Sequence, residues 1–423
     1  MRRYRSIAAA LPALVLLGGG CSSSGSAEDG ETATIQVQVS GEPEETAVYS
    51  SIAEQFEKLN DDVRVEVIEV AEKDDHLARL TTSFAGGNPP DVFLVNFREY
   101  SQFVVRGAIE PMERHLDAVD TDDYFPQPLE AFTYDGELQC MPQNISSLVV
   151  YYNKAIFEAA GLPRPKEGWS WDDFRATARA LTGGDVRGLG IEPTIIRLAP
   201  FVWSAGGEIV DDPESPASLD LDNPGAREAL EFIVSLVRDD GVVPTADEVA
   251  AQDLETRFVT GKLGMLLSSR RDTPAFREVA GLDWDVAPLP VGREPAGILH
   301  SDAYCIAAGS DAVDDAAAFV RFATGEEGET LGALSGRTVP SLISVANSGA
   351  FLDPVQPPRH SEVFLDGIPS IRRTPVLPTW PEIEDIAEQV LIRAFYEEGY
   401  TIDEAIHDLD EETRDLFEEA LQE

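Results

Sequence analysis

Strand-like and helix-like segments alternate in the early part of the chain. Residues 35–39, 63–68 and 91–95 are short, apolar and rich in β-branched side chains, as expected of strands. Residues 44–59 and 74–84 lie between them and carry apolar side chains at helical spacing. Because nearly apolar strands alternate with helices, this pattern predicts a parallel sheet covered by helices on both faces.

The densest run of local signals follows further along the chain. Residues 148–152 form an aromatic and β-branched segment of strand length. Asn153 is positioned to cap a helix over 154–160, and Ser170 is positioned to cap the next helix. The side-chain oxygens of both residues can accept hydrogen bonds from the free N–H groups of a helical first turn.

The same α/β pattern continues to the end of the chain. It predicts a strand over 302–308 and helices over 225–238, over 314–324, and from about residues 381 and 401. The length exceeds what a single hydrophobic core usually serves, so we expect two lobes.

Acidic residues outnumber basic residues by more than two to one. Asp and Glu total 77 against 32 Lys and Arg, which gives a net charge of −45 at pH 7. Nucleic acid and anionic lipid surfaces would repel such a chain, so these two binding classes are excluded. The acidic excess is typical of a solvated surface and does not by itself identify a ligand.

The N-terminus has the organisation of an export signal. Three arginines precede an apolar segment over 8–17, which is too short to span a bilayer as a mature helix. We therefore expect residues 1–20 to be a signal peptide. No later apolar run approaches the length of a membrane-spanning helix.

A cysteine follows this segment directly. The small residues before Cys21 resemble a lipoprotein signal, although Gly18 stands where Leu is usual. The resemblance implies that Cys21 is lipidated and that 21–33, which is rich in Ser, Gly and acids, is a flexible tether. The alternative is an ordinary signal peptide followed by a free cysteine.

Several strips in the right order resemble the extracellular solute-binding proteins of bacterial ABC importers, a sugar-binding family that includes maltose-binding proteins. They are the Tyr-Tyr-Asn-Lys strand end at 151–154, the helix end at 157–165, the Trp-to-Glu strip at 203–208, the Phe-to-Met strip at 258–265 and the strand at 302–308. Together they extend over nearly all of the chain after the tether.

The resemblance implies an α/β, two-lobed periplasmic-binding-protein fold of the type II-like kind. Each lobe would be a mixed or parallel sheet flanked by helices, and a multi-strand hinge would join the lobes. We expect residues 34–140 and 305–338 to form lobe 1, and residues 141–304 and 339–423 to form lobe 2.

The resemblance also implies a function. The chain would be a monomeric substrate-binding lipoprotein, anchored by lipid to the outer face of the cytoplasmic membrane. It would capture a small carbohydrate in the cleft between the lobes by hinge closure and deliver it to the membrane permease of an ABC importer. No cofactor, metal or nucleotide is implied.

A sugar site needs polar groups that pair with hydroxyls and flat aromatic surfaces that pack on pyranose rings. In open α/β sheets such groups lie in loops at strand ends. We therefore expect ligand contacts from polar residues that follow strands or lie at the hinge crossings: Glu42, Asn96, Arg98, Gln143, Asn144, Asp302 and Arg337.

Aromatic candidates are fewer. Trp203 is the expected stacking platform, with a core position as its alternative, and Trp380 is expected to pack the terminal helix. Tyr151 and Tyr152 point to opposite faces of one strand, so one of them is expected in the core. Arg270 stands where many relatives carry an aromatic residue, which indicates a polar or charged group on the ligand.

Two cysteines remain besides Cys21. Cys140 and Cys305 fall in segments that resemble neighbouring hinge strands, and export permits a disulfide. We expect a disulfide across the hinge, with two separate buried thiols as the alternative.

No catalytic constellation is recognisable in the sequence. The five histidines are far apart, and there is no His-Glu-x-x-His, Gly-x-Ser-x-Gly or phosphate-loop motif. A solute-binding role without enzyme activity is therefore expected. The alternatives are a non-sugar solute such as a glycerol phosphodiester, amino sugar or polyamine, a lipoprotein that senses or scavenges without a permease, and an exported glycoside-active enzyme. Arginines converging in the cleft would favour an anion, and acids converging there would favour a cation.

Overall fold

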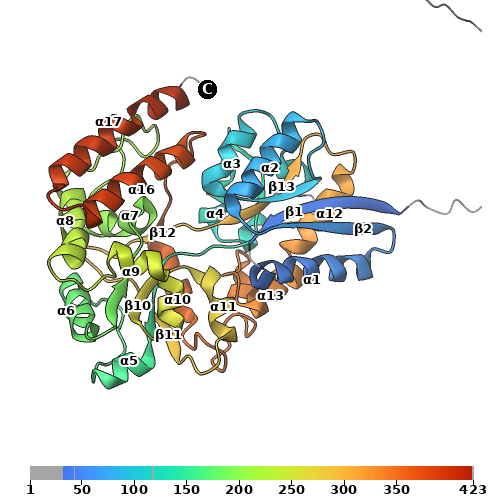
Figure 1. Cartoon of the computed structure of the whole chain (residues 1–423). Helices are drawn as coiled ribbons and strands as arrows, with labels where there is room; N and C mark the ends of the chain where they lie inside the picture. The colour runs from blue at the N-terminus through green and yellow to red at the C-terminus, as the bar shows by residue number, and fades with distance from the viewer. Residues whose placement is uncertain (1–31, 42, 117–118, 422–423) are drawn as a thin grey trace, which may run out of the picture.

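Two α/β lobes lie side by side in the computed structural model, which describes residues 32–41, 43–116 and 119–421 (Figure 1). The expected signal peptide, Cys21, most of the tether and Glu42 lie outside the described residues. Within those ranges, no helix is both long enough and apolar enough to cross a membrane.

Lobe 1 is built on a mixed sheet. Its strand order is β2 (Val63–Val70), β1 (Ala33–Ser40), β3 (Val92–Asn96), β13 (Asp302–Ala307) and β4 (Ile109–Glu110), with β7 (Met141–Pro142) also paired to β13. Strand β1 runs parallel to β2 and β3, as the early sequence pattern predicts. Strand β13 returns from a distant part of the chain and runs antiparallel to β3.

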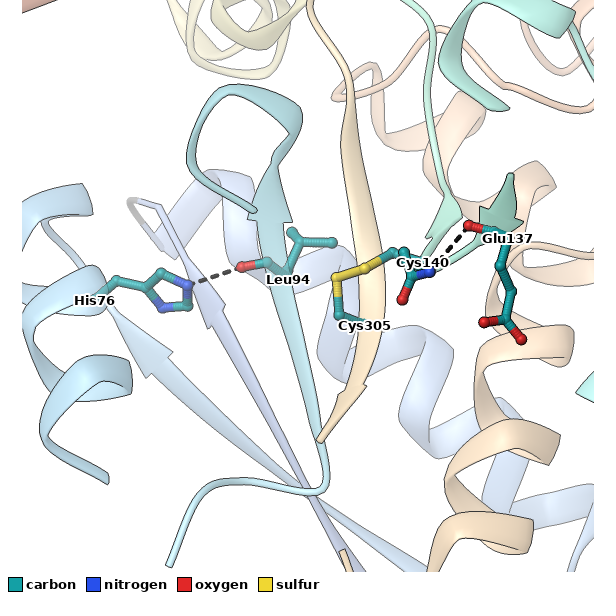
Figure 2. The surroundings of a disulfide bond; sticks show 6 residues. His76, Leu94, Glu137, Cys140 and Cys305 are labelled. Carbon is teal, nitrogen blue, oxygen red and sulfur yellow. Dashed lines mark hydrogen bonds between the residues drawn. A yellow bond between two sulfur atoms is a disulfide. The ribbon is translucent and has the colours of Figure 1, made fainter. Parts of the chain in front are cut away.

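Helices cover both faces of this sheet (Figure 1). Those packed in lobe 1 are α1 (Pro43–Leu59), α2 (Lys73–Ala85), α3 (Phe97–Val104), α4 (Pro126–Ala131), α12 (Val313–Ala323) and α13 (Glu326–Ser335). The buried His76 fixes α2 to the sheet: it accepts a hydrogen bond at Nδ1 from Gln38 Nε2 (3.2 Å) and donates from Nε2 to Leu94 O (2.8 Å; Figure 2). Burial lowers the pKa of this histidine.

Lobe 2 is built on a second mixed sheet. Its order is β11 (Trp284–Ala287), β8 (Val149–Asn153), β10 (Leu263–Ser268) and β9 (Arg187–Gly190), with β8 antiparallel to both neighbours and β9 parallel to β10. Tyr151 and Tyr152 are both buried, because each face of β8 is covered. One of these tyrosines was expected in the core, and the structure places both there.

Local capping signals place the lobe 2 helices as predicted. Asn153 Oδ1 accepts from Ile156 N (3.2 Å), and Ser170 forms a capping box with Asp173. The helices are α5 (Lys154–Ala159), α6 (Trp171–Leu181), α7 (Ile195–Ser204), α8 (Pro224–Arg238), α9 (Ala246–Ala251), α10 (Leu254–Val259), α11 (Thr273–Glu278), α16 (Trp380–Tyr396) and α17 (Ile402–Ala420).

Shorter elements complete the described chain. They are strands β5 (Thr133–Tyr134), β6 (Glu137–Leu138), β12 (Gly297–Ile298) and β14 (Ile371–Arg372), helices α14 (Ile343–Ala346) and α15 (Glu362–Asp366), and the 3₁₀ turns Met112–His115, Thr121–Asp123, Arg270–Asp272 and Ile368–Ser370.

Three chain segments cross between the lobes: one after β7, one before β13 and one after α13. Backbone hydrogen bonds join them, from Ile145 N to Val339 O (2.9 Å) and from Ser146 N to His300 O (2.9 Å). These segments form the multi-strand hinge. The crossings fall slightly inside the expected lobe 2 ranges, because β7 and the start of β13 still pair within the lobe 1 sheet.

Cys140 and Cys305 form a disulfide with a Cα–Cα distance of 4.5 Å (Figure 2). Both residues are fully buried, and Cys305 lies within β13, opposite Phe93 of β3. The disulfide links two neighbouring hinge strands at their lobe 1 ends.

Candidate functional site between the lobes

Polar side chains gather where strands from both sheets end between the lobes. In lobe 1, Asn96 ends β3. In lobe 2, Glu192 follows β9, and Arg271 and Asp272 follow the neighbouring parallel strand β10. Because parallel strands end at one edge of a sheet, the lobe 2 residues come close together, and such edges commonly bind ligands. We call the polar region that these residues form with their neighbours the inter-lobe site.

A chain of hydrogen bonds runs through the lobe 1 side of this site to the hinge. Arg98 donates from Nε to Asn96 Oδ1 (3.1 Å), and Asn96 donates from Nδ2 to Asp302 Oδ1 (2.9 Å). Asp302 in turn donates from its backbone N to Asn144 Oδ1 (2.7 Å). The structure thus brings together four residues that the sequence proposed separately.

An ion pair continues this chain into lobe 2. Arg98 NH1 lies 2.5 Å from Glu384 Oε2 of α16, and the two side chains are only 12% and 14% exposed. The other oxygen of Glu384 accepts from Trp380 Nε1 (2.6 Å). A partly desolvated pair is screened little by solvent, so this contact couples the lobes more strongly than a surface pair would.

The lobe 2 side combines one ion pair with unsatisfied polar atoms. Arg197, near the start of α7, pairs with Glu192 Oε2 at 2.8 Å. Arg197 Nε, Asp272 Oδ2 and His300 Nε2 are buried and have no hydrogen-bond partner among the described residues. Arg197 and Asp272 are 8% and 7% exposed. Because buried polar atoms are nearly always paired, these atoms can serve as donors and acceptors for a polar ligand.

Burial and neighbouring charges shift several pKa values in the inter-lobe site. Burial and then the charge of Arg197 lower the pKa of His300 well below its usual range, so this imidazole is neutral. Burial raises the pKa of Asp272. Burial followed by the charge of Asp272 raises the pKa of Glu255, and burial followed by the charge of Glu192 raises the pKa of Glu388.

Comparison with known proteins decides the family. The family profile of bacterial extracellular solute-binding proteins matches residues 51–356, well over half of the chain. The chain belongs to this family. It is 25% identical over 360 residues to a Brucella abortus binding protein, with 83% of this chain and 85% of the relative covered. It is 24% identical over 306 residues to the galactooligosaccharide-binding protein of Bacillus subtilis, with 70% of each covered.

The fold of this solute-binding protein is also found among solved structures. An ABC substrate-binding protein from Listeria monocytogenes, in complex with cycloalternan, superposes with a TM-score of 0.83. The two are 23% identical, and the match covers 92% of this chain and 99% of the Listeria protein. The two-lobed fold expected from the sequence is therefore confirmed, and the family consists of solute-binding proteins rather than enzymes.

Arg270 lies away from the inter-lobe site of the solute-binding protein. It is 1% exposed and donates from Nε to Gly336 O (3.0 Å) and from NH1 to Ser361 Oγ (3.1 Å). Its guanidinium lies over the rings of Phe351 and Phe364, at 4.7 and 5.2 Å from their centroids. These contacts make Arg270 a packing residue, so the sequence-based expectation of a ligand contact is corrected.

Trp203 is likewise not an open stacking platform. It lies inside α7, is 1% exposed, and has the Arg372 guanidinium 4.8 Å from its ring centroid. The core alternative describes its position better. Trp380 is fully buried in α16, in agreement with the expected packing role.

The other expected residues lie around the hinge. Gln143 is buried and donates from Nε2 to Tyr49 Oη (3.0 Å), so its amide supports the hinge from within lobe 1. Arg337 follows α13 near the third crossing and is half-buried.

Sequence reasoning missed the residues that complete the site. Glu384 lies on a terminal helix whose contact with α3 is not encoded locally. Glu192 follows strand β9, so it belongs to the polar residues that the sequence places at strand ends. It was missed because two of the four residues of β9 are glycines, which are uncommon in strands. Within the described residues, no group of His, Cys, Asp and Glu is arranged to hold a metal ion.

Proposed function

We propose that this protein is the receptor of an ABC importer, which binds a carbohydrate in the inter-lobe site and delivers it to the membrane permease. The observation that carries the proposal is the polar chain from Asn144 through Asp302, Asn96 and Arg98 to Glu384. It joins residues of both lobes and the hinge in a single network.

Unsatisfied atoms on the lobe 2 side support a polyhydroxylated ligand. A sugar hydroxyl both donates and accepts, so it could pair with Asp272 Oδ2 as well as Arg197 Nε. The relatives point the same way, since one binds galactooligosaccharides and a structural neighbour holds cycloalternan.

Delivery requires the lobes to move. A ligand that contacts both lobes stabilises the closed arrangement by its differential affinity for the two states, and the three hinge segments are the elements that would flex. Lipid attached to Cys21 would keep the receptor near its permease on the outer face of the membrane, and the protein would act as a monomer.

A thermal-shift screen of the full chain in detergent tests this proposal. Sugars, glycerol phosphodiesters and polyamines would be added separately, because a ligand that binds only the folded state raises the melting temperature by mass action. We expect a rise with at least one carbohydrate. A rise with only a non-carbohydrate would contradict the ligand class, and turnover of chromogenic glycosides would contradict the binding role.

A further inference from the structure

Carboxylates outnumber cations in the inter-lobe site. The basic side chains that lie among these carboxylates are already ion-paired: Lys73 with Glu99 (2.5 Å), Arg98 with Glu384 (2.5 Å), Arg197 with Glu192 (2.8 Å) and Arg271 with Asp272 (3.4 Å). Each of these cations is therefore compensated by an acid of the chain itself. An anionic ligand group would have to compete with these existing partners.

A second set of acids in the site forms no ion pair with any described residue, although Lys73 acts on Asp385 and Arg271 acts on Glu255. Asp74 on α2, Glu255 on α10, and Asp385 and Glu388 on α16 have no ion-pair partner in the part of the chain that the structure describes. These residues come from both lobes and interact electrostatically across the site. Asp74 acts on Asp385, and Glu192 acts on both Glu255 and Glu388.

Buried polar atoms give independent evidence that a ligand completes the site. Asp272 is 7% exposed, and its Oδ2 has no partner in the described chain; Arg197 is 8% exposed, and its Nε also has none. Leaving such an atom unpaired is unfavourable, so an occupant that supplies hydroxyl groups is favoured. Because Glu192 and Arg197 act on Asp272, these atoms border the same acidic region.

We propose that the ligand of the inter-lobe site is a carbohydrate that carries a protonated amine. This inference rests on the proposed function and specifies its substrate class. The hydroxyls satisfy Asp272 and Arg197, and the ammonium group lies among the carboxylates of Glu255, Asp385 and Glu388. In a partly desolvated site, an unpaired like-charged cluster is unfavourable until a cation enters, so charge is a determinant of selectivity.

Three disaccharides of nearly equal shape provide the test on the full chain in detergent. They are the disaccharide of glucosamine, which is cationic in mildly acidic buffer, cellobiose, which has hydroxyls in place of the amines, and N,N′-diacetylchitobiose, in which the amines are acetylated and neutral. Isothermal titration calorimetry would measure each affinity. We expect the glucosamine disaccharide to bind at least about tenfold more tightly than either neutral sugar, with a preference that weakens as salt is raised.

Variants of the carboxylates locate the effect. Glu255→Gln and Glu388→Gln should each lower the affinity for the cationic disaccharide by about threefold to tenfold, and should lower the affinity for cellobiose less. Glu158→Gln removes an exposed carboxylate from α5, remote from the site, and should leave all three affinities unchanged. Melting temperatures of the variants report whether they fold. The salt dependence of the unaltered protein provides a readout that needs no variant.

The outcomes separate the inference from the function on which it rests. Equal or tighter binding of cellobiose or diacetylchitobiose overturns the inference and leaves the carbohydrate receptor intact. Failure of every carbohydrate to bind overturns both. A preference for the amine that persists in both Glu→Gln variants and at high salt also overturns the inference, because the discrimination would then not be electrostatic.

Discussion

At the scale of single residues, two buried histidines, His76 and His300, are held in their neutral form. His76 must remain neutral because Nε2 donates to Leu94 O while Nδ1 accepts from Gln38. His300 is neutral for a related reason, since burial and nearby guanidinium groups oppose its protonation. Both histidines therefore make folding sensitive to mild acid.

The pH dependence of stability follows from the lowered pKa of His76. Below its ordinary value of 6.5, the unfolded chain takes up a proton that the folded chain refuses, so the free energy of unfolding falls as pH decreases toward the folded pKa. Each such histidine contributes up to about 1.4 kcal/mol per pH unit. In His76→Gln, the amide can reproduce both hydrogen bonds, so urea unfolding between about pH 7 and 5 should show a shallower decline.

His407→Gln is the matched control for this prediction. The His407 side chain is 68% exposed and pairs with Glu411 one turn along the same helix, so its replacement should leave the slope unchanged. Equal slopes for the two variants would show that His76 is not the group that titrates.

The Arg98–Glu384 pair should contribute more than an exposed pair of the same chemistry. We expect a double-mutant cycle with Arg98→Met and Glu384→Gln to give a coupling energy of about 1–3 kcal/mol, since both groups are largely shielded from solvent. The exposed Arg414–Asp410 pair on α17 is the control, with an expected coupling of about 0.5 kcal/mol or less. Both coupling energies would be measured by urea unfolding. Similar values for the two pairs would contradict the prediction that the Arg98–Glu384 contact is stronger than an exposed ion pair.

At the scale of elements, α13 and two hinge segments meet through one buried carboxyl group. Ser341 Oγ lies 2.6 Å from Pro142 O and 2.8 Å from Glu329 Oε1. A hydroxyl has one hydrogen, and neither a carbonyl nor an ionised carboxylate can donate, so both contacts are satisfied only when Glu329 is protonated. Burial agrees with this assignment, because it raises the pKa of Glu329 well above its usual range.

Glu329→Gln should therefore remove a pH-dependent weakness of the hinge. The stabilisation from neutral Glu329 is fully present below its unfolded pKa and is lost as pH rises through the raised folded pKa. A glutamine can donate permanently to Ser341 Oγ, so the variant should lose less stability than the unaltered protein as pH rises above the ordinary value of 4.5. Glu327→Gln, an exposed change in the same helix, should follow the unaltered protein; a shared profile for both variants would count against a protonated Glu329.

Elements with local signals were predicted well from the sequence. Residues only a few positions apart determine the helix caps at Asn153 and Ser170 and the strands of lobe 1. The local sequence is therefore sufficient to predict these elements. Asn96 and Asp302 lie at strand ends, as the sequence predicts, and strand ends meet at a sheet edge. Their contact with a ligand stays a prediction.

The rest of the site depends on contacts between distant segments. Phe351 and Phe364 pack on the buried Arg270, and nothing near Arg270 in the sequence indicates those partners. Trp203 was expected as a stacking platform but lies in α7, whose apolar residues occupy nearly the whole helix surface. A helix of that composition is buried on all sides, which excludes an open platform.

At the scale of the whole molecule, the hydrophobic core does not divide at the boundary between lobes. One apolar cluster includes Phe56 and Phe93 of lobe 1 together with Tyr151 and Trp284 on one face of the lobe 2 sheet. A second cluster lies wholly within lobe 2 and includes residues of the two terminal helices. The lobes therefore share packing on the side of α1 and α11 and meet through polar groups at the inter-lobe site.

The Cys140–Cys305 disulfide is expected to stabilise this arrangement as a whole. It joins positions 165 residues apart and closes a loop that contains all four strands of the lobe 2 sheet. Loop-closure entropy predicts that Cys140→Ala/Cys305→Ala lowers the free energy of unfolding by about 3–5 kcal/mol. Urea unfolding without reductant measures this loss. Reductant should shift the unaltered protein but not the variant, and identical midpoints for the two proteins would contradict the prediction.

The position of β13 has a consequence for the time at which lobe 1 can fold. Asp302 of β13 pairs with Asn96 of β3, 206 positions earlier, and β13 separates β3 from β4 in the sheet. A chain emerging from its N-terminus therefore lacks this strand until all four strands of the lobe 2 sheet have emerged. At about 5–20 residues per second, that delay is roughly 10–40 seconds. Lobe 1 therefore stays incomplete for that interval, which would keep the chain unfolded during the export that its N-terminus predicts.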